Sequence, residues 1–424
     1  MNTCALCKQK KELRKSHIVP RFVGKWLKAT SATGFLRSAT SPSLRLQDIA
    51  KIPLLCKECE EKLSRLETHF AKQVFYPFFK SGKKDVLCDN NLLGFLISLS
   101  WRTLLASYRE FKQDRPSLCP YVDNAERIWR AYLQENSSNT GPYEHHMFFF
   151  DYVTKGEGVP SGFQWYTLRA VDATLVSSEN SVFAYTKFPW MVFVSSIHPT
   201  HLEGWHGTKI EEGKTLPQQQ KIEDADFGSF LLNRSKLALK AIRIPSEKID
   251  RSIIKSIEAM PKRFLESETL RVRLAEVERA RIDAKRKLPR RVVELVEIVE
   301  RGLVEQDLEE SSKQLKKWAL SMIADTLARL PENEALKLDS LIDSAIRKSK
   351  YTGEDTICTF ETNEIIIKFM VNLYYTKDQQ RSRVAKELES LIANRNPNET
   401  KYAAVFSWNP FESDLPYESA FFVP

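Results

Sequence analysis

Four cysteines stand in two closely spaced pairs, a pattern typical of a metal site. Cys4 and Cys7 form one C-x2-C pair near the start of the chain, and Cys56 and Cys59 form the second. Zn²⁺ prefers tetrahedral coordination by sulfur, and four thiolates leave no open position for a substrate or a water. The spacing therefore predicts a structural zinc site rather than a catalytic one. The other cysteines are expected to be buried thiols: Cys88, Cys119 and Cys358.

One histidine lies between the two cysteine pairs, in the stretch SHIVP. This residue, His17, carries an imidazole, whose reference pKa of roughly 6.5 suits a general base at neutral pH. Two interpretations are open. His17 is either a catalytic base on a zinc-held scaffold, or a strand histidine in a zinc module that binds a partner without catalysis.

Positive charge is concentrated at the N-terminus. Residues 1–84 hold 18 Lys and Arg against 6 Asp and Glu, a net charge of 18 − 6 = +12, whereas the whole chain carries +9, so the remaining residues sum to −3. A compact basic segment of this kind suits a polyanion. We expect nucleic acid as the partner, and DNA rather than RNA.

The composition predicts a folded protein of several domains. The chain has 424 residues, of which 42% are hydrophobic, which is enough apolar material for packed cores. Its polar N-terminus lacks the apolar stretch of a signal peptide, and its apolar runs fall short of the roughly 18–20 residues that span a bilayer. We expect a soluble, cytoplasmic protein that does not enter a membrane.

The four cysteines and His17 can act together only if local structure holds them close to one another. "CALC" predicts a tight knuckle, "ELRKSHIVPRF" a strand region, and "CKECEEKLSRLETHFAKQVF" a helix in which Leu63, Leu66 and Phe70 share one face. The expected fold class is α+β, with a zinc-stapled ββα head of treble-clef type and a mixed α/β body that includes a helical segment. The expected domains are the head at 1–85, an α+β domain at 86–245, a helical region at 246–350 and a small α/β region at 351–424.

The body alternates between helical and strand patterns. Residues 91–111 and 123–136 predict helices, the second with Asp123 and Glu126 spaced as a capping box. Segments rich in aromatic and β-branched residues predict strands at 145–153, 163–176, 181–188 and 190–197. A helix is expected at 227–242, another up to Pro289 and another from about residue 334. Residues 351–424 predict strand, strand, helix and strand, in a separate domain or joined to the earlier sheet.

The stretches "CALC", "SHIVP" and "IPLLCKECEEK" together resemble the HNH endonucleases of the His-Me finger superfamily, in the class with two C-x2-C pairs. The resemblance covers about residues 1–75. It implies a His-Me finger fold and an endonuclease that hydrolyses phosphodiester bonds. It also implies that His17 activates water, while a nearby Mg²⁺ or Mn²⁺ acts as a Lewis acid on the phosphate.

The chain departs from that family at its metal ligands. The family's Asp before the histidine is Ser16 here, and its Asn before the third cysteine aligns with Lys51. Glu60 replaces the family's Asn or His after the fourth cysteine, and a carboxylate there can hold a divalent cation through oxygen. Glu60 and Asp48 are therefore the candidate ligands for the catalytic metal. The candidate contacts to nucleic acid are Lys15, Arg21 and Lys51.

Other interpretations stay open for the chain as a whole. The head could be an inactive zinc module that binds nucleic acid, or a basic adaptor that docks on a protein or RNA. The body is expected to recognise a target, a trigger or a protein partner, as in bacterial and antiviral defence factors that carry a nuclease head. A metal site at His198, His201 and His206 is not expected, since their spacing fits no known ligand set.

Overall fold

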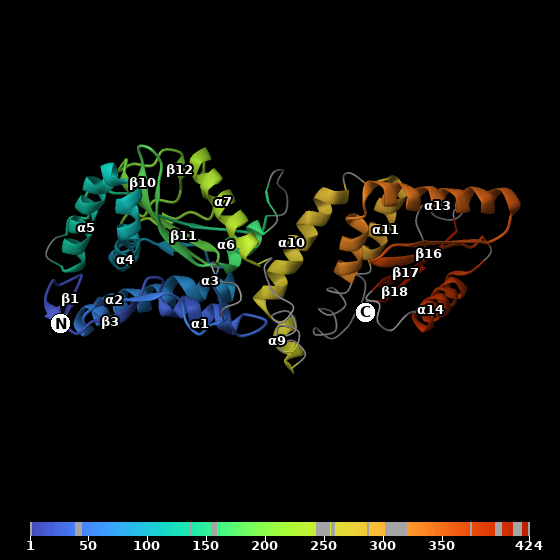
Figure 1. The fold of residues 1–424 in the computed structure, drawn as a ribbon, viewed down its shortest axis with the longest axis horizontal. Coiled ribbons are helices and arrows are strands. Elements are labelled where there is room, and N and C mark those ends of the chain that lie inside the picture. The colour runs from blue at the N-terminus through green and yellow to red at the C-terminus, as the bar shows by residue number, and fades with distance from the viewer. Residues whose placement is uncertain are drawn as a thin grey trace. The chain divides into compact units, whose positions relative to one another are not determined.

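The computed structural model shows a mixed α/β protein that divides into two compact units (Figure 1). It describes residues 2–38, 45–135, 138–153, 159–160, 162–242, 255, 259–285, 288–301, 320–373, 375–394, 401–409 and 418–422. Unit 1 comprises residues 1–272 and unit 2 residues 273–424. The segments expected as a head and an α+β domain, 1–85 and 86–245, both fall in unit 1. The segment 246–350 is divided between the units, and 351–424 lies in unit 2.

The N-terminal part of unit 1 is built from short strands and three helical segments. β1 (Asn2–Thr3) pairs with β2 (Lys10–Lys11), and β3 (Arg14–His17) pairs antiparallel with β6 (Lys51–Leu55). Between β3 and β6 lie α1 (Arg21–Ala29), β4 (Leu36–Arg37) and β5 (Arg45–Leu46). After β6, α2 (Lys57–Phe70) passes through the π-helical turn η1 (Ala71–Phe75) into α3 (Tyr76–Ser81).

The body of unit 1 is a four-stranded antiparallel sheet with helices on both faces. The strand order is β8 (His145–Phe149), β11 (Met191–His198), β10 (Val182–Phe188) and β9 (Asp172–Ser177). α4 (Asn90–Asp114) packs between this sheet and α2, beside α5 (Cys119–Leu133). α6 (Phe163–Arg169) and α7 (Ala225–Ile242) cover the other face. Two short strand pairs lie in the connections. β7 (Val86–Leu87) pairs with β13 (Thr215–Leu216), and β12 (Trp205–His206) pairs with β14 (Lys221–Ile222).

The N-terminal segment shares a core with the body. Cys4, Leu55 and Leu63 are buried in one cluster with Trp101 and Trp129, which lie on α4 and α5. A segment of about 85 residues with a metal site has little core of its own, because small domains bury a small fraction of their surface. The N-terminal segment, which carries the four cysteines, shares a buried core with α4 and α5 of unit 1.

Unit 2 has its own sheet and its own core. The strand order is β15 (Thr356–Glu361), β16 (Ile365–Val371), β17 (Tyr402–Trp408) and β18 (Glu418–Phe422), and β16 and β17 are parallel. One face packs against α11 (Arg290–Arg301), a helical stretch at 320–328 and α13 (Glu332–Thr352), while α14 (Lys377–Ala393) packs on the other. Two further helices precede α11: α9 (Pro261–Leu265), in unit 1, and α10 (Glu268–Lys285). The C-terminal strands thus form a separate sheet.

Two expectations about the elements were wrong. Residues 163–169 form helix α6 rather than a strand. Most of this helix is buried, so its apolar residues show no helical period, and the sequence pattern of a buried helix then looks like that of a buried strand. Helix α5 begins at Cys119, with Pro120 in its first turn, so Asp123 and Glu126 lie inside the helix and form no capping box. Asp123 instead accepts a hydrogen bond from the Tyr108 hydroxyl.

Over the part of the chain that the structure describes, we find no helix with both the length and the apolar character needed to cross a lipid bilayer.

Candidate metal centre and the site around His17

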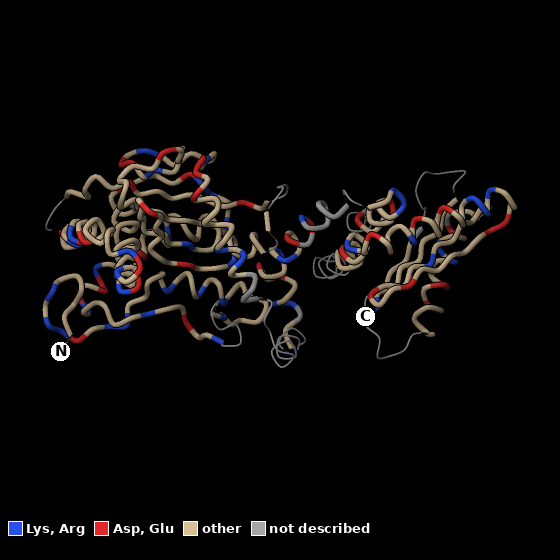
Figure 2. Tube along the Cα trace, turned by 45° about the horizontal axis from the view of Figure 1, so that its top comes forward, with Lys and Arg blue, Asp and Glu red and all other residues tan. Residues whose placement is uncertain are grey.

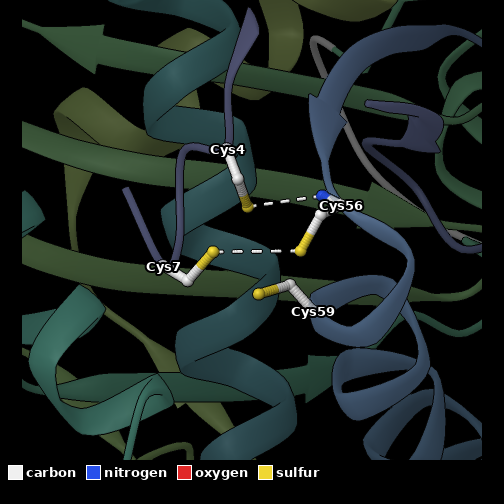
Figure 3. Close-up of side chains that lie close together, drawn as sticks. All are labelled: Cys4, Cys7, Cys56 and Cys59. Carbon is white, nitrogen blue, oxygen red and sulfur yellow. Dashed lines mark hydrogen bonds between the residues drawn. The ribbon is translucent and has the colours of Figure 1, made fainter. Parts of the chain in front are cut away.

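The sulfurs of Cys4, Cys7, Cys56 and Cys59 all lie within 4.8 Å of one another. Figure 3 shows the four side chains converging from the N-terminal knuckle and from the start of α2. Four sulfurs bound at about 2.3 Å to one central ion would be about 3.8 Å apart. The Cys7 and Cys56 sulfurs are 3.8 Å apart, which matches this spacing. The four cysteines could therefore hold a metal ion such as zinc.

Backbone contacts fix the knuckle that carries the first pair. The Lys8 amide donates to the Cys4 carbonyl, and Lys8 has a left-handed φ of 59°, which closes a tight turn after Cys7. The Ala5 amide donates to the carbonyl of Leu54, so the knuckle is tied to β6 just before the second pair. These bonds bring together two cysteine pairs that are far apart in sequence.

The thiols are set up for metal coordination. Burial raises the pKa of Cys4, but hydrogen bonds from backbone amides, including that of Cys56, outweigh this and lower it to about 7. Burial and the neighbouring sulfurs raise the pKa of Cys59 well above its usual value. A bound cation stabilises thiolates, and its binding releases their protons. Without a cation the Cys59 thiol stays protonated, and a cation bound at the cluster would favour its thiolate.

His17 lies at the end of β3, opposite Lys51 on β6. Its Nε2 is 3.0 Å from Oδ2 of Asp48, and the Lys51 ammonium lies 2.9 Å from the same oxygen. Burial raises the pKa of the Asp48 carboxyl, but the hydrogen bonds from Lys51 and His17 prevail and hold that pKa well below its usual range. Asp48 is thus an anion that accepts from Nε2–H, and this tautomer leaves Nδ1 with its lone pair.

Ser16, which precedes His17 on β3, meets Glu60 of α2. The Ser16 hydroxyl is fully buried and donates to Oε2 of Glu60, at 2.6 Å. These are the positions at which the resemblance places two ligands of the catalytic metal. The Ser16 and Glu60 oxygens alone are fewer ligands than a divalent cation takes. However, Mg²⁺ in proteins often keeps several bound waters and uses only one or two carboxylates.

A buried arginine anchors the strand that carries His17. Arg102, on α4, is 1% exposed, and its Nη1 donates both to the His17 carbonyl (2.8 Å) and to Oε1 of Glu67 (2.6 Å). Glu67, on α2, is thereby engaged with Arg102. The sequence offered a signal for this residue, because Arg102 interrupts the apolar run "LISLSWRTLL". A charged residue in the middle of a buried helix needs a partner.

The expected site residues therefore fall into separate groups. The cysteines form one group, His17 forms a second with Asp48 and Lys51, and Glu60 pairs with Ser16. Among the described residues, the cysteine cluster is the one set of three or more His, Cys, Asp and Glu side chains with metal-binding spacing. Lys15 and Arg21 are exposed, on β3 and at the start of α1. Lys and Arg outnumber Asp and Glu along this part of the chain (Figure 2).

The histidines of the 198–206 loop have different partners. His198 stacks on Tyr121 with the ring centres 3.9 Å apart, whereas Nδ1 of His201 is 2.8 Å from Glu144. His206 lies 3.4 Å from Glu223. The three imidazoles are thus each engaged in a separate contact.

No protein-family model, curated protein or solved structure matches this chain. Among the described residues of unit 1, the four-sulfur cluster and the His17–Asp48–Lys51 group are two sets of side chains that could support a reaction or a bound ion.

Proposed function

We propose that the chain is an endonuclease of the HNH, or His-Me finger, type that hydrolyses phosphodiester bonds in nucleic acid. In this proposal β3, β6 and α2 form the ββα finger, and the four cysteines hold a structural Zn²⁺. The observation that carries the proposal is the hydrogen bond between His17 and the ionised Asp48. A carboxylate that holds one imidazole nitrogen leaves the other free to take a proton from water.

The side chains around His17 have different roles in the proposed reaction. Asp48 fixes the tautomer and orientation of the imidazole, and Nδ1 is the atom that accepts the proton. Lys51 is 38% exposed, so its ammonium can contact a phosphate oxygen while it stays near Asp48. A divalent cation at Glu60 and Ser16, when bound, supplies Lewis-acid stabilisation of charge on the phosphate. Exposed Lys15 and Arg21 contact the phosphate backbone on either side.

The direct test is cleavage of plasmid DNA and of a structured RNA in Mg²⁺ or Mn²⁺. We expect the wild type to cut, and His17→Ala to cut at least about a hundredfold more slowly, because general-base catalysis contributes roughly 10²- to 10⁴-fold. Zinc content and nucleic-acid affinity should stay near wild type. His206→Ala is the matched control, since His206 is exposed and contacts Glu223 rather than this group.

The result also separates the alternatives. If the wild type binds nucleic acid but cuts under neither metal, the chain is a binding module. The observation that favours this second candidate is the closure of the Ser16 and Glu60 side chains on each other, which satisfies the carboxylate without a cation.

A second substitution tests the Ser16–Glu60 pair as the cation site. Ser16→Asp places two carboxylates in contact, and their repulsion is relieved when a divalent cation binds. We expect Ser16→Asp to need less Mn²⁺ or Mg²⁺ for half-maximal cleavage than the wild type. Its melting temperature should also rise with added cation more than that of the wild type. Equal metal dependence in the two proteins would place the cation elsewhere.

A further inference from the structure

An exposed tyrosine stands where the α2–η1–α3 helix leaves its π-helical turn. Tyr76 is the first residue of α3 and is 45% exposed, although aromatic side chains usually lie inside. Lys72 and Lys80, four residues before and after it, are exposed as well. π-Helical turns occur often at functional sites. The function proposed above makes no use of this face.

The ring of Tyr76 is supported by aromatic neighbours, of which Phe75 is buried and Phe22 is half-buried. Its centre is 5.5 Å from that of Phe75 and 6.4 Å from that of Phe22, which lies on α1. Trp26 of α1 stacks on Phe79 of α3 with ring centres 4.0 Å apart. An aromatic side chain held from below and open above is a platform on which a planar ring can stack.

The surroundings of Tyr76 are basic and free of acidic residues in the sequence. Residues 13–47, which include α1, contain seven Lys and Arg and no Asp or Glu, and residues 68–84 contain four Lys and no Asp or Glu. The exposed cations closest in sequence to Tyr76 and to its neighbour Phe22 are Arg21, Lys25, Lys72 and Lys80. In the described structure, none of these four lies within ion-pair distance of a carboxylate.

This face adjoins the candidate site through the start of α1. His17 ends β3, α1 begins at Arg21, and Phe22 in its first turn contacts Tyr76. A strand bound at Tyr76 and Arg21 would therefore lie on a part of the chain that is continuous in sequence with His17.

We propose that the surface formed by Tyr76, Lys72, Lys80, Arg21 and Lys25 binds single-stranded nucleic acid, with a base stacked on Tyr76 and phosphates on the four cations. Base stacking on aromatic residues needs unpaired bases, whereas a duplex offers only its phosphates to such a surface. The inference rests on the proposed function only in taking the bound strand to be the substrate.

The test is equilibrium binding, measured by fluorescence anisotropy on full-length His17→Ala protein, so that cleavage plays no part. The three labelled probes have the same length: a 20-nucleotide oligo(dT) single strand, a 20-nucleotide oligo(U) single strand, and a duplex DNA of 20 base pairs. We expect Tyr76→Ala to weaken binding to single strands by roughly tenfold, the scale of one base–aromatic stack, and to leave duplex binding within about twofold. Tyr76→Phe should bind like the parent.

Three further comparisons test whether the effect of Tyr76→Ala comes from base stacking on this surface. Tyr351→Ala is the matched control, because Tyr351 is 93% exposed in unit 2 and should leave binding unchanged. Lys72→Gln with Lys80→Gln, which disturbs no packing, should reduce the salt dependence of single-strand binding by about 1.4 in log–log slope. Comparing dT with U tells whether the strand is DNA or RNA.

The surface is excluded if Tyr76→Ala and the lysine pair both bind single strands as the parent does, or if Tyr76→Ala weakens duplex and single-strand binding equally. Such a result would leave the proposed nuclease standing, since that is judged by cleavage. Conversely, the wild type could fail to cut while Tyr76→Ala weakens single-strand binding. That result would contradict the proposed nuclease and support the proposed binding surface.

Discussion

Cys56→Ser is expected to abolish zinc binding and to unfold unit 1 well beyond the cysteine cluster. Structural zinc sites of this type contribute an apparent binding free energy of about 10–16 kcal/mol in small peptides, which is comparable to the whole stability of a domain. Cys56 also lies in the core cluster that joins the N-terminal segment to α4 and α5. Loss of the ion therefore releases the N-terminal knuckle. It also exposes the apolar surface of α4 and α5 against which the cysteine segment packs.

The measurements are zinc content by atomic emission and thermal unfolding followed by circular dichroism. We expect about one zinc per wild-type chain, and a melting temperature that falls when a strong chelator is added. Cys358→Ser is the matched control, since Cys358 lies in unit 2 and should leave zinc content unchanged. The hypothesis is wrong if Cys56→Ser melts at the wild-type temperature, or if the wild type is folded without metal.

The cysteine cluster could be predicted because the information for it is local. Each C-x2-C pair forms its own knuckle, and two such pairs in one segment have few alternatives to a shared ion. The four sulfurs do lie together. The start of the helix at the second pair was predictable for the same reason, since α2 begins at Lys57.

The surroundings of His17 were less predictable, because its partners come from distant parts of the chain. Asp48 is brought close by the pairing of β3 with β6, and the register of two short strands is not visible in sequence. Asp48 was expected as a metal ligand, yet its contacts are with His17 and Lys51. Arg102 reaches the strand only because α4 packs against α2, a tertiary arrangement that no local pattern encodes.

The two errors in the body have a related cause. A short helix buried on most sides, such as α6, shows the same run of apolar and aromatic residues as a buried strand. Asp123 and Glu126 have the spacing of a capping box, but Pro120 favours an earlier helix start, and tertiary contacts use the two carboxylates elsewhere. In each case packing outweighed the local signal.

Arg102→Met is expected to destabilise unit 1 by about 3–5 kcal/mol and to reduce cleavage. Its guanidinium is buried between α4, α2 and β3, and removing it leaves the Glu67 carboxylate largely buried without its partner. Breaking one side of a buried ion pair costs this much because the remaining charge stays desolvated. The same change removes the hydrogen bond to the His17 carbonyl, so the imidazole loses part of its positioning. Arg102 acts through the backbone and touches no substrate.

The double variant Arg102→Met with Glu67→Gln separates these two effects. Replacing the carboxylate by an amide removes most of the charge penalty, so the melting temperature should recover toward wild type, as measured by thermal unfolding. The His17 carbonyl still lacks its donor, and cleavage at saturating substrate should therefore stay low while single-strand affinity and zinc content are normal. Arg102→Lys keeps the charge but loses the guanidinium, whose Nη1 donates to both acceptors and whose Nε donates to the Ser98 carbonyl. It should therefore fall between wild type and Arg102→Met in both readouts. If the double variant recovers cleavage together with stability, Arg102 supports the fold alone, and the orientation of His17 depends on Asp48.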